Sequence, residues 1–308
     1  MQEFDYEKNV MGSEASISIV TDSRAHADAT AATLFAIAER EEARFSRFRP
    51  ESELSLLNKE RSRSVSPECL ETVLLGRDLY RASSGLFNPL VAIARFGYDA
   101  DIAEVKGRDR TGNSHDAYSI DMESVGIDEK TRTVFLQEGQ TLDTGGYTKG
   151  HTAQLMAEAA VGCQGVLVNL GGDIYARGLD AEGKPFVFHI DNPKDSSMDL
   201  SFFVTNAGIA TSGSYNRTWM LEGKPFFHIL DASGTKNPVT DIVSATVIAP
   251  SGAEADAFAT VALVAGVQAA ECLLEEEGYE YCFITTNGSI IFSGAFPLVE
   301  NAESYLYV

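Results

Sequence analysis

Residues 243–263 have the sequence VSATVIAPSGAEADAFATVAL, which changes from a strand pattern to a helix pattern around Pro250. The first part, 243–249, is a largely apolar run with several β-branched residues, which is typical of a buried strand. The second part predicts a helix over about 252–265, and the residues after it predict another over about 267–277. Since strands and helices elsewhere also mix without regular β–α–β alternation, we expect an α+β fold.

Comparable patterns predict the remaining elements. The helix expected over about 66–84 has a clear start, because Ser66-Pro67-Glu68 combines an N-cap, a proline at the first position and an acid in the first turn. The other expected helices cover about 25–45 and 148–160, and strands are expected near 14–20, 117–121, 132–136, on both sides of the Gly-Gly turn in 165–178, and near 185–191, 201–205, 226–230, 281–286 and 289–293. No repeat or linker divides the chain, so we expect a single domain over residues 1–308.

The charge balance argues against one class of partner. The chain has 308 residues, with 24 Lys and Arg against 45 Asp and Glu, which gives a formal net charge of −21. Such a surface repels polyphosphate backbones, so we expect no nucleic-acid partner. An anionic small ligand would need help from a local cation, a helix N-terminus or a metal ion.

Neither disulfides nor membrane spans are expected. The cysteines have no CxxC or zinc-site spacing, so we expect reduced thiols, with one disulfide as an open alternative. Residues 1–11 are polar and acidic, unlike a signal peptide, and no apolar run approaches the roughly 18 residues of a membrane span. We therefore expect a cytoplasmic protein as given, and an exported form trimmed of its leader stays open.

The helix predicted at 252–265 contains a candidate metal site. Asp256 and Thr260 are four residues apart and therefore share one helix face. A carboxylate and a hydroxyl so placed offer two hard oxygen ligands for Mg²⁺, near a helix N-terminus that favours phosphate. The alternative is that the acid only compensates the helix dipole.

Two glycine-containing turns are candidates for ligand contact. In LDTGGYTKG, 142–150, the glycines let a ligand approach the backbone and Lys149 supplies a positive charge for phosphate, although the P-loop spacing is absent. In VNLGGDIYARG, 168–178, an Asn and an Asp flank a Gly-Gly turn. The structural alternatives are a strand-to-helix turn with a surface lysine for the first and a plain β-hairpin for the second.

Two further stretches contain groups suited to proton transfer or phosphate binding. In FFHILDASG, 226–234, we expect His228 in an apolar strand with Asp231 three residues on, where the imidazole could take a proton from a hydroxyl. In ATSGSYNR, Tyr215 could stack on a ring and Arg217 could bind phosphate. The alternatives are a core histidine with satisfied hydrogen bonds and an ordinary turn.

In order and spacing these stretches resemble the FAD:protein FMN transferase family, also called the ApbE family. The resemblance covers about residues 11–290 and begins at MGS, where the family has Met-Gly-Thr. The matching stretches are MGS at 11–13, FSRFRPESELSLLN at 45–58, GLFNPLVAIARFGYD at 85–99, LDTGGYTKGHT at 142–152, VNLGGDIYARG at 168–178, IATSGSY at 209–215, HILDASG at 228–234 and ADAFAT at 255–260.

The resemblance implies a fold and a reaction. The fold would be ApbE-like, with mixed, mostly antiparallel sheets flanked by helices and an FAD cleft between two subdomains. One or two Mg²⁺ ions would hold the pyrophosphate of FAD, a Thr or Ser hydroxyl of an acceptor flavoprotein would attack the phosphorus on the FMN side, and AMP would leave. The implied acceptors are redox-pump subunits or fumarate-reductase-like proteins.

The resemblance also assigns residues. Asp256 and Thr260 match the metal ligands of the family, and the carbonyl of Gly146 matches its backbone ligand. Asp256 is thereby also implied in catalysis, and His228 matches the histidine that deprotonates the acceptor hydroxyl. The residues that match the lining of the FAD site are Met11, Phe48, Leu86, Phe87, Asn88, Asp143, Lys149 and Leu230.

Some positions depart from the family pattern. Asn88 and Gln154 each stand where an Asp is usual, and Ser214 replaces the Asp of Thr-Ser-Gly-Asp-Tyr. The proposed metal ligands and His228 are all present. Two alternative functions stay open, namely an FAD pyrophosphatase that uses water as acceptor and a non-catalytic FAD-binding protein.

Overall fold

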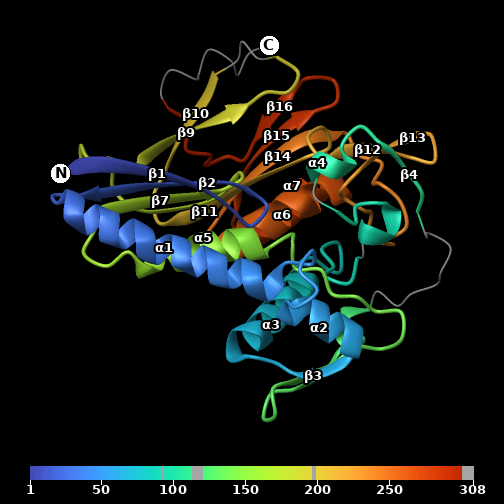
Figure 1. Cartoon of the computed structure of the whole chain (residues 1–308). Helices are drawn as coiled ribbons and strands as arrows, with labels where there is room; N and C mark the ends of the chain where they lie inside the picture. Colours follow the sequence, from blue (N-terminus) through green and yellow to red (C-terminus); the bar gives the residue numbers. More distant parts are fainter. Residues whose placement is uncertain (92, 101, 113–120, 196–198, 300–308) are drawn as a thin grey trace.

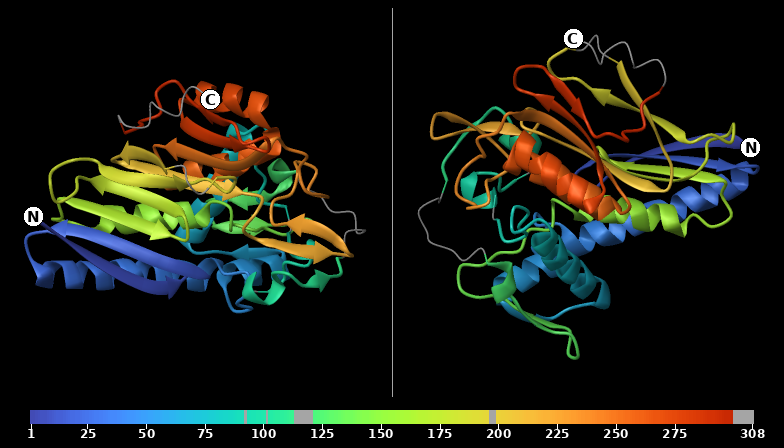
Figure 2. Two further views of the ribbon diagram at one scale, coloured as in Figure 1. Left: turned by 90° about the horizontal axis from the view of Figure 1, so that it is seen from above. Right: turned by 180° about the vertical axis from the view of Figure 1, so that it is seen from behind.

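An eight-stranded, fully antiparallel sheet forms the centre of the computed structural model (Figures 1 and 2). The structure describes residues 1–91, 93–100, 102–112, 121–195 and 199–299. In spatial order the strands are β1 (Gln2–Val10), β2 (Ser13–Thr21), β7 (Gly165–Leu170), β8 (Asp173–Gly178), β11 (Ala207–Gly213), β14 (Ile242–Ala249), β15 (Glu280–Thr285) and β16 (Ile290–Phe292). Every residue of the central strand β14 is buried, as expected for its apolar run.

Helices cover one face of this sheet and a hairpin covers the other (Figure 2). The helices are α1 (Arg24–Phe45), α5 (Thr148–Ala159), α6 (Gly252–Ala265) and α7 (Val267–Glu277), and the hairpin is β9 (Phe186–Asp191) with β10 (Asp199–Val204). Alternate residues of β15 show the division, since Phe283 packs in the core under α6 while Cys282 packs in the core under the hairpin.

The edge strand β1 is amphipathic. Its residues Phe4 and Tyr6 pack toward the α1 side, whereas Glu3, Asp5 and Glu7 are exposed on the opposite face. Pairing with the more apolar β2 therefore buries only one side of the strand.

A smaller helical unit follows α1 in the chain and has its own core (Figure 1). It contains α2 (Glu53–Glu60), α3 (Pro67–Ala82), the 3₁₀ turn Met122–Ser124, and a three-stranded sheet of β3 (Ser62–Ser64), β6 (Thr133–Phe135) and β5 (Gly126–Asp128). The third part contains the 3₁₀ turn Ile93–Phe96, α4 (Ile102–Val105), β4 (Asp109–Arg110), β12 (Thr218–Leu221) and β13 (Lys224–Phe227) around the buried Trp219.

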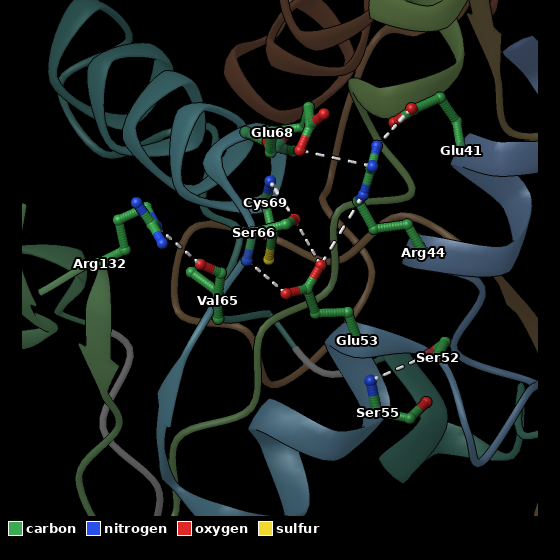
Figure 3. A network of polar contacts seen from close by, with 11 residues as sticks. Glu41, Arg44, Ser52, Glu53, Ser55, Val65, Ser66, Glu68, Cys69 and Arg132 are labelled. Carbon is green, nitrogen blue, oxygen red and sulfur yellow. Dashed lines mark hydrogen bonds and ion pairs between the residues drawn. The ribbon is translucent and has the colours of Figure 1, made fainter.

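Arg44 connects α1 to the smaller helical unit (Figure 3). Its guanidinium lies 2.5 Å from Glu41, 3.7 Å from Glu53 and 3.5 Å from Glu68. Glu53 in turn accepts hydrogen bonds of 2.6 Å from the backbone N–H and the hydroxyl of Ser66, the N-cap of α3. The end of α1 is thus tied to the first turns of α2 and α3, which fixes one wall of the cavity described below.

The helix predictions and most strand predictions are confirmed. The helix predicted at 252–265 has these bounds, and Ser66 caps α3 with Pro67 at its first position, as expected. The strand predicted at 226–230 is wrong in its extent, because β13 ends at Phe227. The side-chain amide of Asn237 binds the carbonyls of Phe227 and Ile229 at 2.7 and 2.6 Å, which replaces strand pairing there.

Several elements were not predicted, chiefly β1, α2, β11 and β12. The strand predicted near 117–121 lies almost wholly outside the described residues. None of the helices in the described part of the chain is long and apolar enough to cross a bilayer.

Helices α5 and α6 approach each other closely at Gly150 and Gly252, and this contact is testable. A Cβ on Gly150 would lie 2.0 Å from the carbonyl oxygen of Gly252. Because the added Cβ meets a backbone atom that cannot rotate away, we expect Gly150→Ala to destabilise the protein by about 3 kcal/mol, the upper end of the usual overpacking cost. Urea unfolding measures this value. Gly294→Ala is the control, since nothing lies within 4 Å of its added Cβ, and equal midpoints for the two variants would contradict the prediction.

Candidate functional site

One cavity of about 860 Å³ opens where the helix-covered face of the large sheet meets the other two parts of the protein. Its wall contains residues from the β1–β2 hairpin tip, the loop after α1, the segment 86–104, the turn before α5, the β7–β8 turn, β11 and the residues after it, the segment after β13, and α6. All of the predicted site residues line it, namely Met11, Phe48, Leu86, Phe87, Asn88, Asp143, Gly146, Lys149, His228, Leu230, Asp256 and Thr260. The fold thus brings the set together, and what each residue binds there stays a prediction.

Asp256 lies in the second turn of α6 and is only 6% exposed. The helix start is already satisfied by a capping box between Ser251 and Glu254, so the dipole-compensating acid is Glu254 rather than Asp256. Within the described residues the carboxylate of Asp256 has one hydrogen bond, a long one of 3.4 Å from the backbone N–H of Gly150. Burial raises the pKa of Asp256, although Lys149, this N–H and Arg217 all act to lower it.

Thr260 lies one turn further along α6, and its hydroxyl is 3.1 Å from that of Ser212 on β11. Gly146 lies in the turn before α5, where an added Cβ would approach the ring of Phe87 to 3.1 Å. A carboxylate, a hydroxyl and a backbone carbonyl are the hard oxygen donors that Mg²⁺ prefers. No cluster of three or more His, Cys, Asp or Glu side chains suited to a metal occurs in the described residues, and a metal ion at these three oxygens stays a prediction.

Lys149 is not a surface lysine. Its ammonium is hydrogen-bonded to Asp173, and the two side chains are 14% and 7% exposed. Burial lowers the pKa of Lys149 to about 8, while Asp256 acts to raise it and Arg217 to lower it further. Asp173 follows the Gly171-Gly172 turn, so the Asp of the GGD motif and the Lys of the TKG motif meet in the cavity.

Asp143 and Arg47 form the second ion pair of the wall. The guanidinium lies 2.6 Å from the Asp143 carboxylate, which also accepts the backbone N–H of Gly145 at 2.9 Å. Arg47 is stacked over the rings of Phe48 and Tyr98, with 4.8 and 4.4 Å to the centroids. These contacts tie the loop after α1 to the turn that contains Gly146.

His228 lies just beyond β13 rather than in a strand. Its Nδ1 is fully enclosed and has no hydrogen-bond partner within the described part of the chain. Burial lowers the pKa of His228 to about 3, and the positive charges of Arg217, Lys149 and Arg47 add to this effect in that order. The imidazole is therefore neutral at neutral pH.

Met11 forms the tip of the β1–β2 hairpin with Gly12. Both residues have positive φ, 56° and 68°, as a two-residue type I′ turn requires. A methionine in this left-handed conformation is strained, in contrast to Gly12. The turn brings the hairpin tip to the cavity wall.

A comparison with protein-family models identifies the family of the chain. The model described as "ApbE family" matches residues 11–283, nearly the whole of the chain. The chain belongs to the ApbE family.

Relatives of this ApbE-family protein include a protein of Klebsiella pneumoniae strain 342 named FAD:protein FMN transferase, which is 36% identical over 146 residues. That match covers 46% of this chain and 41% of the relative, so it spans about two fifths of the relative's length. Another protein of the same name from the same strain is 26% identical over 307 residues, covering 94% of this chain and 92% of the relative.

The fold is that of solved ApbE proteins. The crystal structure of the ApbE protein from Thermotoga maritima has a TM-score of 0.84 at 21% sequence identity, and the match covers 96% of this chain and 98% of that one. The expected ApbE-like fold of mostly antiparallel sheets flanked by helices is thereby confirmed.

Sequence reasoning missed part of the ApbE site. Arg47, Tyr98 and Ser212 lie within the quoted motifs but were given no role, and Asp173 was noted only as part of a turn. The ion pairs could not be found from sequence, since Asp143 and Arg47 are 96 positions apart. The GGD and TKG motifs each place a charged residue beside a glycine turn, which is the one signal in the sequence for the pair of Asp173 and Lys149.

The pH dependence of stability should show the effect of His228. The pKa falls from the ordinary 6.5 to about 3 in the folded protein, so between these values the unfolded chain binds a proton that the folded chain excludes. Stability is therefore lost as the pH falls from 6.5 toward 3. We expect His228→Gln to remove about 2 kcal/mol of the stability difference between about pH 8 and pH 5. Urea unfolding at both pH values checks this, and an unchanged difference would refute it.

Proposed function

We propose that this chain is a flavin transferase that cleaves the pyrophosphate of FAD and attaches FMN to a Thr or Ser hydroxyl of an acceptor flavoprotein. The names of the relatives and the family membership support the reaction class. The acceptors we propose, from the family resemblance, are a redox-pump subunit or a fumarate-reductase-like protein.

The charges of the cavity wall carry this proposal. Most charged side chains that line it have an ion-pair partner within 4 Å, including Lys149 with Asp173 and Arg47 with Asp143. Within the described residues the exceptions are the exposed Glu104, the buried Asp256 and the half-buried Arg217. A desolvated charge without a partner is costly, so the cavity calls for one cation at Asp256 and one anion at Arg217. A magnesium diphosphate supplies both.

The residues present have definite parts in the reaction. Asp256, Thr260 and the Gly146 carbonyl would hold Mg²⁺, which when bound supplies neutralising charge to the diphosphate. Arg217 binds diphosphate oxygens through its planar guanidinium, with Lys149 as a further positive charge in the same wall.

His228 takes the proton of the acceptor hydroxyl. The hydroxyl oxygen forms a bond to the FMN phosphorus while the bond from that phosphorus to the bridging oxygen breaks, and AMP leaves with the electron pair of that bond. Two of the cations that lower the pKa of His228, Arg217 and Lys149, are those that the bound diphosphate would neutralise. The imidazole therefore becomes a stronger base when the substrate is in place.

Mass spectrometry of a candidate acceptor tests the reaction. After incubation with the protein, FAD and Mg²⁺, the acceptor should gain the mass of one FMN less water, and either FAD or Mg²⁺ alone should give no gain. We expect Asp256→Asn to lower the rate by at least about 100-fold, as the loss of one charge-stabilising group does. Glu254→Gln is the matched control, since it changes an acid on the same helix but keeps the capping box.

The same samples distinguish the alternatives. Release of free FMN and AMP without an acceptor, faster than transfer, would identify a pyrophosphatase. Tight FAD binding without turnover at saturating Mg²⁺ would identify a binding protein. Full transfer activity in Asp256→Asn would overturn the assignment of the metal site.

Arg217 gives an independent prediction. Because its guanidinium has no carboxylate partner in the described residues, we expect Arg217→Met to lower kcat/KM for FAD by about 100-fold, with Arg217→Lys intermediate. The acid limb of the pH–rate profile should also move to higher pH, since Arg217 lowers the pKa of His228. Steady-state kinetics measure both effects. Lys130→Met, which removes an exposed positive charge outside the cavity, should change neither.

A further inference from the structure

Two carboxylates, those of Asp173 and Asp256, act on the ammonium group of Lys149. Its ammonium is hydrogen-bonded to Asp173, and the charge of Asp256 also acts on it. The next residue, Gly150, donates its backbone N–H to the Asp256 carboxylate at 3.4 Å. The backbone of Lys149 therefore lies beside Asp256, while its flexible side chain extends to Asp173.

An ammonium on Asp256 would compete with a divalent cation. Both bind the same carboxylate lone pairs, and the low dielectric of a buried site strengthens either contact. Asp256 is 6% exposed, so water would weaken such a Lys149–Asp256 pair little. The metal site proposed here is available only if Lys149 is held elsewhere.

Asp173 is built to hold the lysine. It is 5% exposed and stands at the start of β8, paired with Leu170 of β7 and Ala210 of β11. The turn before it is fixed by the Asn169 side chain, which accepts the N–H of Gly172 at 2.8 Å. An acid on a rigid central strand thus anchors a side chain that has four rotatable bonds.

We propose that Asp173 is a positioning residue that keeps Lys149 away from Asp256 and so reserves the Asp256 carboxylate for a divalent cation. The inference rests on the proposed function, because that function places the cation at Asp256. Asp173 touches neither the cation nor the reacting atoms and acts through Lys149.

Mn²⁺ binding to the full chain without FAD or acceptor is the test. The electron paramagnetic resonance signal of free Mn²⁺ reports the dissociation constant directly. We expect Asp173→Asn to weaken Mn²⁺ binding by about tenfold, as the loss of a supporting residue around a metal site does. The double variant Asp173→Asn with Lys149→Met also removes the competing ammonium group. Its affinity for Mn²⁺ should return to within about threefold of the wild-type value. Asp173→Glu should retain the wild-type affinity, because it keeps the charge.

The outcomes separate this role from a structural one. A general loss of folding would weaken Mn²⁺ binding equally in the single and the double variant, and that result would overturn the proposal. Unchanged Mn²⁺ affinity in Asp173→Asn would overturn it too. In FMN transfer, Asp173→Asn should raise the KM for Mg²⁺.

The inference and the proposed function can fail separately. If the Mn²⁺ affinities follow the predicted order but no acceptor gains FMN, the positioning role of Asp173 stands and the transferase assignment falls. If the wild-type protein transfers FMN, but the Asp173→Asn variant binds Mn²⁺ as tightly as the wild type does, only the positioning role of Asp173 is refuted.

Discussion

The site depends on one backbone contact, the approach of helices α5 and α6 at Gly150 and Gly252. A side chain on either glycine would place a Cβ 2.0 Å from the carbonyl oxygen of the other. Gly208 of β11 is as tightly placed, since its Cβ would lie 2.6 Å from the Cα of Gly252. These three glycines let two helix starts and the central sheet converge. Gln154 completes the junction by accepting the N–H of Gly252 at 3.0 Å.

This convergence decides where charge is placed. Lys149 and Asp256 come from adjacent helices, Asp173 comes from the strand below them, and all three are largely removed from water. A buried charge without an ion-pair partner costs free energy. Which charges of the cavity wall lack a partner therefore indicates the charges of the ligand. Ion pairs such as Lys149 with Asp173 and Arg47 with Asp143 cancel within the cavity wall. Among the described wall residues, the buried Asp256 and the half-buried Arg217 have no ion-pair partner, which is why we propose a ligand that is itself a cation bound to an anion.

Much of the fold was predictable because its central elements have strong periodic patterns. The strand β14 and the helix α6 were predicted from a single stretch, and the cap at Ser66 fixed the start of α3. The strand β1 was missed because its outward residues are acids, so it has the composition of a polar tail until β2 pairs with it. His228 was assigned to a strand because its neighbours are apolar, and only the structure shows Asn237 taking the backbone carbonyls there.

The residues of the candidate site were predictable from the sequence, but the ion pairs between them were not. Residue patterns and the family resemblance together predicted all the proposed residues, and all of them line one cavity. Contacts such as Arg47 with Asp143 depend on tertiary distance, which no local pattern encodes.

The acidic outer face of β1 has a consequence for the solution behaviour of the protein. As an edge strand, β1 presents unpaired backbone groups to any other extended chain. Glu3, Asp5 and Glu7 repeat along it at every second residue, so two molecules that approached through this edge would bring rows of like charge together. Such repulsion disfavours pairing between molecules through this edge.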